Sequence, residues 1–392
     1  MNMKIINLDH LSANPILPEV QEAMIDTIKN NYGNPSSQHR LGDAAATALI
    51  SARESVARLI NCAVPNEIVF TSGGTESVNH AIKGVAFAKG SKGKHIITSN
   101  IEHSSVIRSL KRLKLFDYRV TSVSVDKYGM VDPKEIEGAI KEDTILITIM
   151  HSNNEIGTIQ PIKEIAGIAK SRNVLFHTDA VDSVGVIPVD VQDLGVDLLS
   201  FGSNNYYGPA GVGGLYIKRG TGIWPMLDGG VQENNKRAGT ENLIGIVGMG
   251  KAAELALRDM EKRIIISRNL KERLLRKLPE YIDEYFLNGH PELTLPNHIS
   301  LSIKYIEGES VVLMLDEEGI AVSTRSACAA GALRASHVLL SIGRDFADAQ
   351  GTMVITFGVD NTEEDVDRFL SVLKETVISL REISPLYKKP AK

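Results

Sequence analysis

Residues 174–203, VLFHTDAVDSVGVIPVDVQDLGVDLLSFGS, decide the fold class that we predict for this chain. The segment holds two short apolar runs, VLFHTDA and VDLLSFGS, and each run ends in small or polar residues. Short apolar runs of this kind are typical of strands buried on both faces of a sheet. The segment therefore predicts two buried strands with polar residues at their carboxyl ends.

The same pattern continues outward, from about residue 67 to residue 218. Three more runs predict strands: EIVFTS, HIITS and TILITIM. Between them, stretches such as Glu76–Ala88 and Ile162–Lys170 carry apolar residues at three- and four-residue spacing, which predicts helices. This alternation indicates an α/β domain whose parallel or mostly parallel sheet is covered by helices. Right-handed crossovers would align the strand carboxyl ends along one edge, where ligands usually bind.

Beyond Thr240 the pattern changes. Residues 241–271 predict a long helix, and its small-residue start, NLIGIVGMGKAAELAL, predicts tight packing. After it, HISLSIKYI, GIAVST and TMVITFG predict strands, while SVVLMLDEE and EDVDRFLSVLKETVISL predict helices. We therefore expect a smaller C-terminal α/β domain. The predicted parts are an N-terminal segment that joins the small domain (1–15), the large domain (16–255) and the small domain (256–392).

The composition excludes several classes of protein. The chain has 392 residues, of which 43% are apolar and 23% charged, and this balance is typical of globular proteins. Its net charge of −5, without a basic stripe, argues against nucleic-acid binding. The apolar runs are strand-sized, so we expect no membrane span and no signal peptide. Two cysteines cannot form a disulfide framework, which favours a reducing, cytoplasmic location.

Two segments at the expected sheet edge could bind a ligand. In TSGGTE, residues 71–76, two glycines precede a helix whose first N–H groups could hold a phosphate. A tight capped turn would explain the same residues. In HTDA, residues 177–180, the carboxylate of Asp179 could pair with a protonated ring nitrogen, or it could simply cap the next turn.

Cys328, in the segment STRSACAAG, could carry sulfur chemistry. Its small and polar neighbours predict an exposed loop, where a deprotonated thiol could be a nucleophile or a metal ligand. The alternative is a buried cysteine that acts as a small apolar residue. That alternative suits Cys62, in LINCAVP, much better.

Taken together, the motifs resemble those of the cysteine desulfurase family in order and spacing, over essentially the whole chain. The matching motifs are GNPSSQHRLG, TSGGTES, TSNIEHSSV, MHSNNEIGTIQP, FHTDAVDSVG, SFGSNNYYGPAGVGGLYIKRG, KRAGTEN, STRSAC and LREISPLY. The resemblance implies a fold type I aminotransferase-like architecture with a mostly parallel seven-stranded sheet plus the small C-terminal domain. It also implies pyridoxal phosphate (PLP), a homodimer and a cluster-scaffold partner. The distance from Cys328 to the next strand suggests the family's long-loop class, which serves iron–sulfur cluster assembly and tRNA thiolation.

Several positions match the family's functional residues. His103 matches the histidine that stacks on the PLP ring, and Asp179 matches the carboxylate that pairs with the ring nitrogen. Asn154 matches a side-chain amide near the phenolic oxygen of PLP. Cys328 matches the cysteine that carries the persulfide. Gly74 and Thr75 match phosphate contacts of the family. Thr240 matches a further phosphate contact, which the family supplies from the partner subunit.

Other positions depart from the family. Where the family has a histidine followed by the lysine that binds PLP covalently, this chain has Asn204 and Asn205. An amide nitrogen is delocalised into its carbonyl and can neither form the imine nor shuttle protons. Asp182 replaces a glutamine near the phenolic oxygen, and Val354 replaces the arginine that clamps the substrate carboxylate. A phosphate-binding serine falls at Gly202, although Ser203 follows it.

These departures leave three functional hypotheses. The favoured one is a protein of sulfur transfer for iron–sulfur cluster assembly, with weak or absent desulfurase activity and with PLP non-covalent or absent. In it, Cys328 carries a persulfide or completes the ligand set of a shared [2Fe–2S] cluster. The first alternative is an active cysteine desulfurase that binds PLP without a covalent link and uses another base, such as His103. The second is a non-catalytic regulatory or structural dimer.

Overall fold

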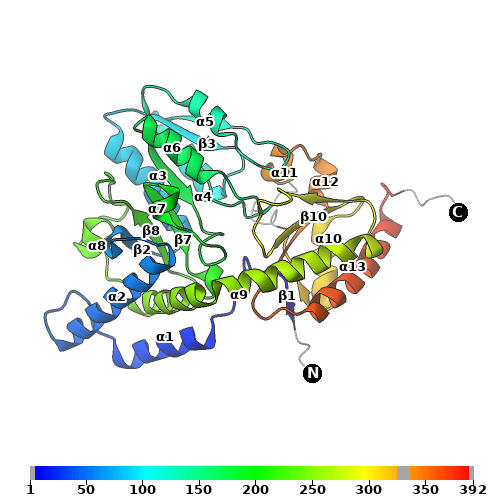
Figure 1. Cartoon of the computed structure of the whole chain (residues 1–392), viewed down its shortest axis with the longest axis horizontal. Helices are drawn as coiled ribbons and strands as arrows, with labels where there is room; N and C mark the ends of the chain where they lie inside the picture. The colour runs from blue at the N-terminus through cyan, green and yellow to red at the C-terminus, as the bar shows by residue number, and fades with distance from the viewer. Residues whose placement is uncertain (1–4, 325–334, 388–392) are drawn as a thin grey trace.

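The computed structural model describes residues 5–324 and 335–387, and it consists of a larger and a smaller body joined by one long helix (Figure 1). The larger body contains most of the chain up to that helix. The smaller body contains the C-terminal strands and helices together with the first strand of the chain. The fold class predicted from the sequence, a fold type I-like α/β protein with a smaller C-terminal domain, is confirmed.

A seven-stranded sheet forms the centre of the larger body. Strand β8 runs antiparallel to β2 and β7, and all other neighbouring strands are parallel. The sheet is therefore mostly parallel, as expected. Its strands, in spatial order, are β2 (Ile68–Thr71), β8 (Gly213–Ile217), β7 (Leu198–Gly202), β6 (Leu175–Asp179), β5 (Thr144–Thr148), β3 (His95–Ser99) and β4 (Arg119–Val123).

Both faces of this sheet are buried. Consecutive strand residues point to opposite faces, so Leu198 packs in one apolar cluster and Leu199 in the other. Helices α3 and α4 contribute to the cluster of Leu198, while α2, α6 and the first half of α9 contribute to that of Leu199. The helices of this body are α1 (Pro18–Asn30), α2 (Arg40–Leu59), α3 (Gly74–Lys89), α4 (Ser104–Leu113), α5 (Pro133–Ala139), α6 (Ile162–Ser171), α7 (Val191–Leu194) and α8 (Gln232–Asn235).

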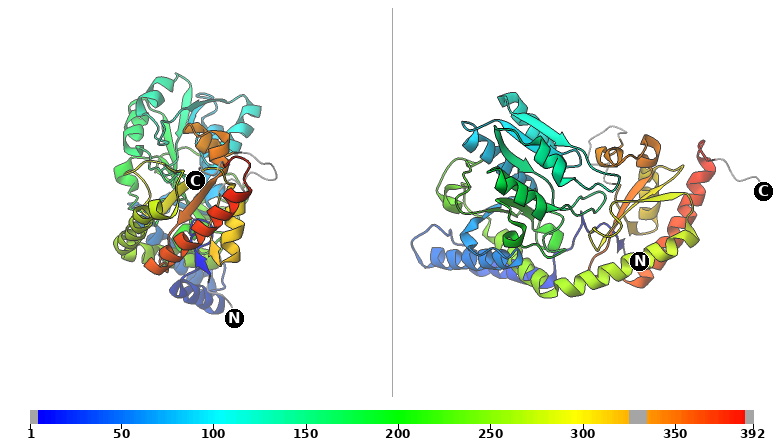
Figure 2. Two further views of the ribbon diagram at one scale, coloured as in Figure 1. Left: turned by 90° about the vertical axis from the view of Figure 1, so that its right-hand side faces the viewer. Right: turned by 45° about the horizontal axis from the view of Figure 1, so that its top comes forward.

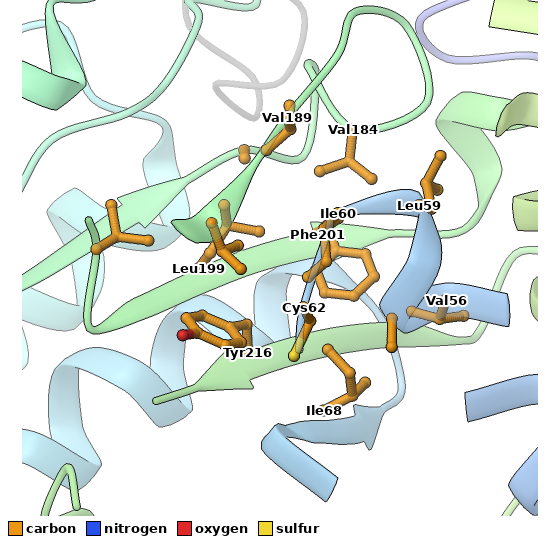
Figure 3. Close-up of a cluster of buried hydrophobic side chains, with 14 of the residues drawn as sticks. Val56, Leu59, Ile60, Cys62, Ile68, Val184, Val189, Leu199, Phe201 and Tyr216 are labelled. Atoms are coloured by element: carbon orange, nitrogen blue, oxygen red, sulfur yellow. The ribbon is translucent and has the colours of Figure 1, made fainter. Parts of the chain in front are cut away.

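Cys62 belongs to this core and not to a site. Its sulfur lies among apolar side chains that include Val56, Ile68 and Tyr216 (Figure 3). Burial raises the pKa of the Cys62 thiol to about 12, which keeps it protonated and unreactive at neutral pH. The prediction that Cys62 acts as a small buried residue is confirmed.

The smaller body has its own core around a three-stranded antiparallel sheet in the order β12–β10–β9. Strand β1 lies parallel to β11, which attaches the N-terminal segment to this body. The elements are β1 (Ile6–Asn7), β9 (Tyr285–Asn288), β10 (His298–Ile303), α10 (Gly308–Glu317), β11 (Ile320–Ala321), α11 (His337–Ser341), α12 (Phe346–Gln350), β12 (Thr352–Thr356) and α13 (Glu363–Ile383).

Helix α9 (Leu243–Tyr281) runs along both bodies (Figures 1 and 2). Met260 packs in a core of the larger body, and Leu270, further along the helix, packs in the core of the smaller one. The predicted domain boundary at residues 255 and 256 falls inside this helix and stays a prediction. No helix in residues 5–324 and 335–387 is both long and apolar enough to cross a membrane.

Candidate active site

Five segments meet at the carboxyl edge of the large sheet. They are the amino end of α3, the amino end of α4, the loop after β5, the end of β6 and the turn after β7. Crossovers between parallel strands bring these segments together although they are spread over residues 73–206. The edge therefore collects most of the residues that the sequence singled out.

The amino end of α3 forms a cradle suited to a phosphate. Gly73 precedes the helix with φ +148°, a conformation that favours glycine, and an added Cβ there would meet only open space. The N–H groups of Gly74, Thr75 and Glu76 are the first of the helix, so they have no intrahelical acceptor. The positive end of the helix dipole adds to this preference for an anion.

The cradle is packed directly onto the end of β6. A Cβ added at Gly74 would lie 2.4 Å from Cγ2 of Val181, two residues beyond Asp179. Only glycine at residue 74 therefore lets the amino end of α3 approach the chain that carries Asp179. The structure brings together the proposed phosphate contacts and the proposed partner of the ring nitrogen.

Asp179 is buried at the end of β6 and accepts a hydrogen bond from the N–H of Val181 at 3.1 Å. Burial, and secondarily the charge of Asp182, raises the pKa of Asp179 to about 7. Near neutral pH the carboxyl group is therefore only partly ionised, and a cationic partner would stabilise its ionised form. A protonated ring nitrogen is such a partner.

A second carboxyl group, Glu102, lies buried beneath the same edge. Its Oε1 accepts hydrogen bonds from Ser99 Oγ at 2.7 Å and from the N–H of Met150 at 3.1 Å, whereas its buried Oε2 has no partner among the described residues. Burial raises the pKa of Glu102 to about 8. The sequence analysis missed this residue, because neither its burial nor its contact with Met150, two residues beyond β5, has a local signature. Its position next to His103 was the only available hint.

His103 caps the amino end of α4. Its Nδ1 accepts a hydrogen bond from the N–H of Ser105 at 3.2 Å and lies 2.8 Å from Ser105 Oγ. We assign the tautomer from these contacts: a neutral ring whose Nδ1 is an acceptor carries its proton on Nε2. His103 Nε2–H is therefore a hydrogen-bond donor, and the catalytic role of His103 as a base stays a prediction.

Asn205 lies in a short 3-10 turn after β7 (Asn204–Tyr206), is 6% exposed, and contacts Asp182 directly. Its Nδ2 donates to the carbonyl oxygen of Val181 at 2.7 Å and to Asp182 Oδ1 at 3.0 Å. Its Oδ1 accepts a hydrogen bond from Asn204 Nδ2 at 2.8 Å. Two of the departures from the family pattern, Asn205 and Asp182, thus form one hydrogen-bonded pair.

The remaining departures on β7 lie near the cradle. A Cβ added at Gly202 would lie 3.1 Å from Asn204 Oδ1 and 3.8 Å from the nitrogen of Gly74. The Asn204 side chain therefore borders the space that a larger residue at position 202 would use. Ser203 is fully buried, and its Oγ faces Gly208, where an added Cβ would lie 2.0 Å away. The Ser203 hydroxyl is therefore turned toward Gly208, and its contact with a phosphate stays a prediction.

Three predicted positions lie on other elements. Half-buried Asn154 follows β5, and its carbonyl oxygen is 3.2 Å from His298 Nε2. Val354 is buried in β12, where it pairs with Ser300 and, outside the sheet, with Ser323. Thr240 is exposed. It lines a small cavity of about 140 Å³ together with Thr71, Ser72 and Arg237.

Cys328, predicted as the persulfide carrier and as a possible cluster ligand, lies outside the described residues. Within residues 5–324 and 335–387, no group of three or more histidine, cysteine, aspartate or glutamate side chains is arranged to hold a metal ion.

Comparisons with known proteins agree with this geometry. A family model described as aminotransferase class-V matches residues 6–369. Over 380 residues the chain is 50% identical to the cysteine desulfurase IscS of Dictyoglomus turgidum, which covers 97% of this chain and 96% of that protein. The chain belongs to the cysteine desulfurase family. It is also 48% identical to the cysteine desulfurase IscS of Methanosarcina thermophila, over 98% of this chain and 95% of that protein.

Two solved structures match most of the chain. The chain is 37% identical to a NifS-like protein, with a TM-score of 0.90 over 96% of this chain and all of that one. A second structure, described as SspA in complex with cysteine, is 33% identical, with a TM-score of 0.80 over 90% of this chain and 98% of that one. Both likenesses include the larger and the smaller body.

The residues of this family member fit PLP in part. The open cradle before α3 suits the phosphate, and the raised pKa of the buried Asp179 carboxyl suits a group whose ionised form a cationic ring nitrogen would stabilise. Position 205 does not fit a covalent link, since its amide is not a nucleophile and is already hydrogen-bonded to Asp182. The described residues thus suit PLP held by its phosphate and its ring nitrogen.

Proposed function

We propose that this protein is a cysteine desulfurase of iron–sulfur cluster assembly that holds PLP without a covalent link. One observation carries the proposal: the open α3 cradle and Asp179 remain joined at one sheet edge, through the contact of Gly74 with Val181, while position 205 offers no amine. The relatives named as cysteine desulfurases support an active enzyme more than the sulfur-transfer protein with weak or absent activity that the sequence favoured.

Each residue has a role that its environment supports. The first N–H groups of α3 bind the phosphate, and Asp179 keeps the ring nitrogen protonated. PLP bound in this way supplies an electron sink for the carbon atoms of the substrate. His103, whose Nδ1 is the acceptor, offers an N–H hydrogen bond from Nε2 to the bound ligand. Because no amine at position 205 can displace the product, we expect slow turnover.

The resemblance supplies the remaining parts of the proposal. Cys328 accepts the sulfur as a persulfide or ligates a cluster shared with a scaffold protein. Thr240, which is exposed, completes the phosphate site of a second subunit in a homodimer. The cytoplasm, a reducing compartment, suits a free thiol of this kind.

The test is the release of alanine and sulfide from L-cysteine by protein saturated with PLP, with dithiothreitol present as the thiol that reduces the Cys328 persulfide to sulfide. We expect slow release that disappears in Cys328→Ala and falls strongly in Asp179→Asn. Borohydride treatment should leave no cofactor covalently attached to the chain, as measured by intact mass. If wild type and Cys328→Ala release equal amounts of sulfide, the enzyme proposal fails.

The second candidate is a sulfur relay without desulfurase activity, in which Cys328 receives persulfide sulfur from another protein. The hydrogen bond between Asn205 and Asp182 favours it, because these two side chains pair with each other in the altered pocket without a cofactor. The relay predicts that the thiol of Cys328 accepts sulfur from a small persulfide donor in protein free of PLP. Labelling of wild type but not of Cys328→Ala, with no alanine formed from cysteine, would select this candidate.

A further inference from the structure

A separate cavity of about 320 Å³ lies where the N-terminal segment, the middle of α9 and the chain after β12 meet. This volume is within the range of small-molecule sites in proteins. Gly185, Asn205 and Tyr207 form the wall on the side of the large sheet. None of the residues assigned above to the phosphate or to the ring nitrogen lines it, so the cavity is distinct from the cradle.

Arg263 of α9 is the buried cation of this cavity. Its side chain is only 13% exposed, yet the structure records no hydrogen bond from any of its five donors to a described residue. The carboxylate of Asp259 is 3.8 Å from Nη2, and the guanidinium carbon lies 5.2 Å from the ring centre of Tyr207. Burial lowers the pKa of Arg263, which reflects how poorly the charge is solvated. A guanidinium in this state is suited to an anion that accepts two parallel hydrogen bonds.

The carboxylate of Asp259 is shared between Arg263 and Arg258. It accepts two hydrogen bonds from Arg258, each 2.8 Å long, whereas it lies 3.8 Å from Arg263. Lys262 and Glu19 also line the cavity, and both are exposed. The lining thus holds three full cations and two carboxylates, and Arg263 is the least exposed of these cations.

The rest of the lining is mixed. Asn297 is 8% exposed, and its buried Oδ1 has no hydrogen-bond partner among the described residues. His10 is also buried and is held by Asn14, whose Oδ1 lies 2.8 Å from its Nδ1. Apolar side chains cover much of the remaining wall: Leu11, Leu17, Val186, Phe357 and Val359.

We propose that this cavity binds a small monocarboxylate with an apolar chain, its carboxylate on Arg263 and its chain against the apolar wall. The ligand would border Asn205, whose side chain is hydrogen-bonded to Asp182 in the candidate active site. The cavity therefore gives the protein a second small-molecule site beside the first. The inference concerns binding alone and does not depend on the proposed desulfurase activity.

The test uses hexanoate as the probe and hexanamide as its uncharged counterpart, both titrated calorimetrically into the full chain without PLP or cysteine. We expect hexanoate to bind with a Kd on the order of 1 mM or below, and hexanamide about tenfold more weakly or worse. Arg263→Gln should weaken hexanoate binding by about tenfold or more. Arg268→Gln is the matched control on the same helix, and it should change the affinity by less than about twofold, because Arg268 is exposed and does not line the cavity.

Equal affinities for hexanoate and hexanamide would overturn the proposal, as would no detectable binding of hexanoate to wild type. An unchanged affinity in Arg263→Gln would overturn it as well. If Arg263→Gln does not fold, Arg263→Lys decides: it keeps the charge but loses the two-pronged geometry, so we expect an intermediate affinity. These titrations contain neither cofactor nor cysteine, so failure of the desulfurase proposal leaves their outcome untouched.

Discussion

At the scale of single residues, the two buried carboxyl groups of the site make the stability depend on pH. Burial raises the pKa of Glu102 from 4.5 to about 8 and that of Asp179 from 3.8 to about 7. The folded protein therefore keeps protons that the unfolded chain has already released. This difference stabilises the folded protein at low pH, and the stabilisation is lost as the pH rises through the pKa values of the folded state.

Buried histidines act in the opposite direction below pH 6.5. Burial lowers the pKa of His80 and His151 to about 4 and that of His177 to about 3, so the unfolded chain binds more protons there as the pH falls. We predict that the free energy of unfolding of the cofactor-free protein is largest near pH 6.5 and falls toward pH 8. Each proton by which the folded and unfolded states differ changes the free energy of unfolding by about 1.4 kcal/mol per pH unit.

Thermal unfolding measured between pH 5 and pH 8.5 checks this prediction. Glu102→Gln cannot ionise, so its stability should decline less steeply than that of wild type above pH 6.5. If the variant and wild type show the same slope over that range, Glu102 does not carry its proton in the folded state.

Position 205 can be tested by restoring the amine. Asn205→Lys alone would place a cation beside Asp182, and the ion pair would keep the amine protonated and unable to attack PLP. We predict that the double variant Asn205→Lys, Asp182→Gln forms a link to PLP that borohydride reduces, detected as an increase in intact mass. The single variant should give much less of this product. An equal yield from both would show that Asp182 does not control the amine.

At the scale of secondary-structure elements, the close contact of α9 with α2 depends on Gly250. A Cβ added there would lie 2.7 Å from both Cα and Cβ of Ala52, which is buried in α2. Although alanine is the better helix former, we predict that Gly250→Ala destabilises the protein by about 1–3 kcal/mol through overpacking.

Gly167 in α6 provides the matched control, since an added Cβ there meets nothing within 4 Å. Gly167→Ala should stabilise the protein by up to about 1 kcal/mol through helix propensity. Chemical denaturation of the two variants gives both values. Stabilisation of the same size by both substitutions would mean that the α2–α9 contact relaxes without cost.

The sequence predicted strands well where a buried strand is a continuous apolar run. VLFHTDA and VDLLSFGS contain β6 and β7, and the small residues before Gly250 indicated the tight helix contact that α9 makes. Two strands of the same sheet were not predicted. Edge strand β4 has mostly exposed or half-exposed residues, and β8 begins with two glycines, so neither shows a continuous apolar run.

The sequence predicted which segments form the site, but it did not predict how their side chains pair. Motifs indicated the cradle and Asp179, because a glycine turn before a helix and a carboxylate after a strand are local signals. The hydrogen bond between Asn205 and Asp182 and the burial of Glu102 arise from packing between segments far apart in the chain. Arg263 was missed for the same reason, since an arginine in a long helix is usually a solvated residue.

At the scale of the whole molecule, α9 couples the two bodies because it contributes side chains to both cores. Leu274, fully buried, belongs to the core of the smaller body. We predict that Leu274→Ala lowers the stability by about 2–5 kcal/mol and shifts a single calorimetric transition to lower temperature. A separate transition at low temperature, with the original one unchanged, would show that the smaller body unfolds independently.

The pairing of β1 with β11 has a consequence for the synthesis of the chain. Ile6 pairs with Ile320, whereas the large sheet is complete once β8 has been made. At the usual speed of translation, about 5–20 residues per second, Ile6 waits on the order of tens of seconds for its partner. A chain stalled on the ribosome before Ile320 should therefore present a folded large sheet with a protease-sensitive amino terminus, which becomes protected only when the last quarter of the protein emerges.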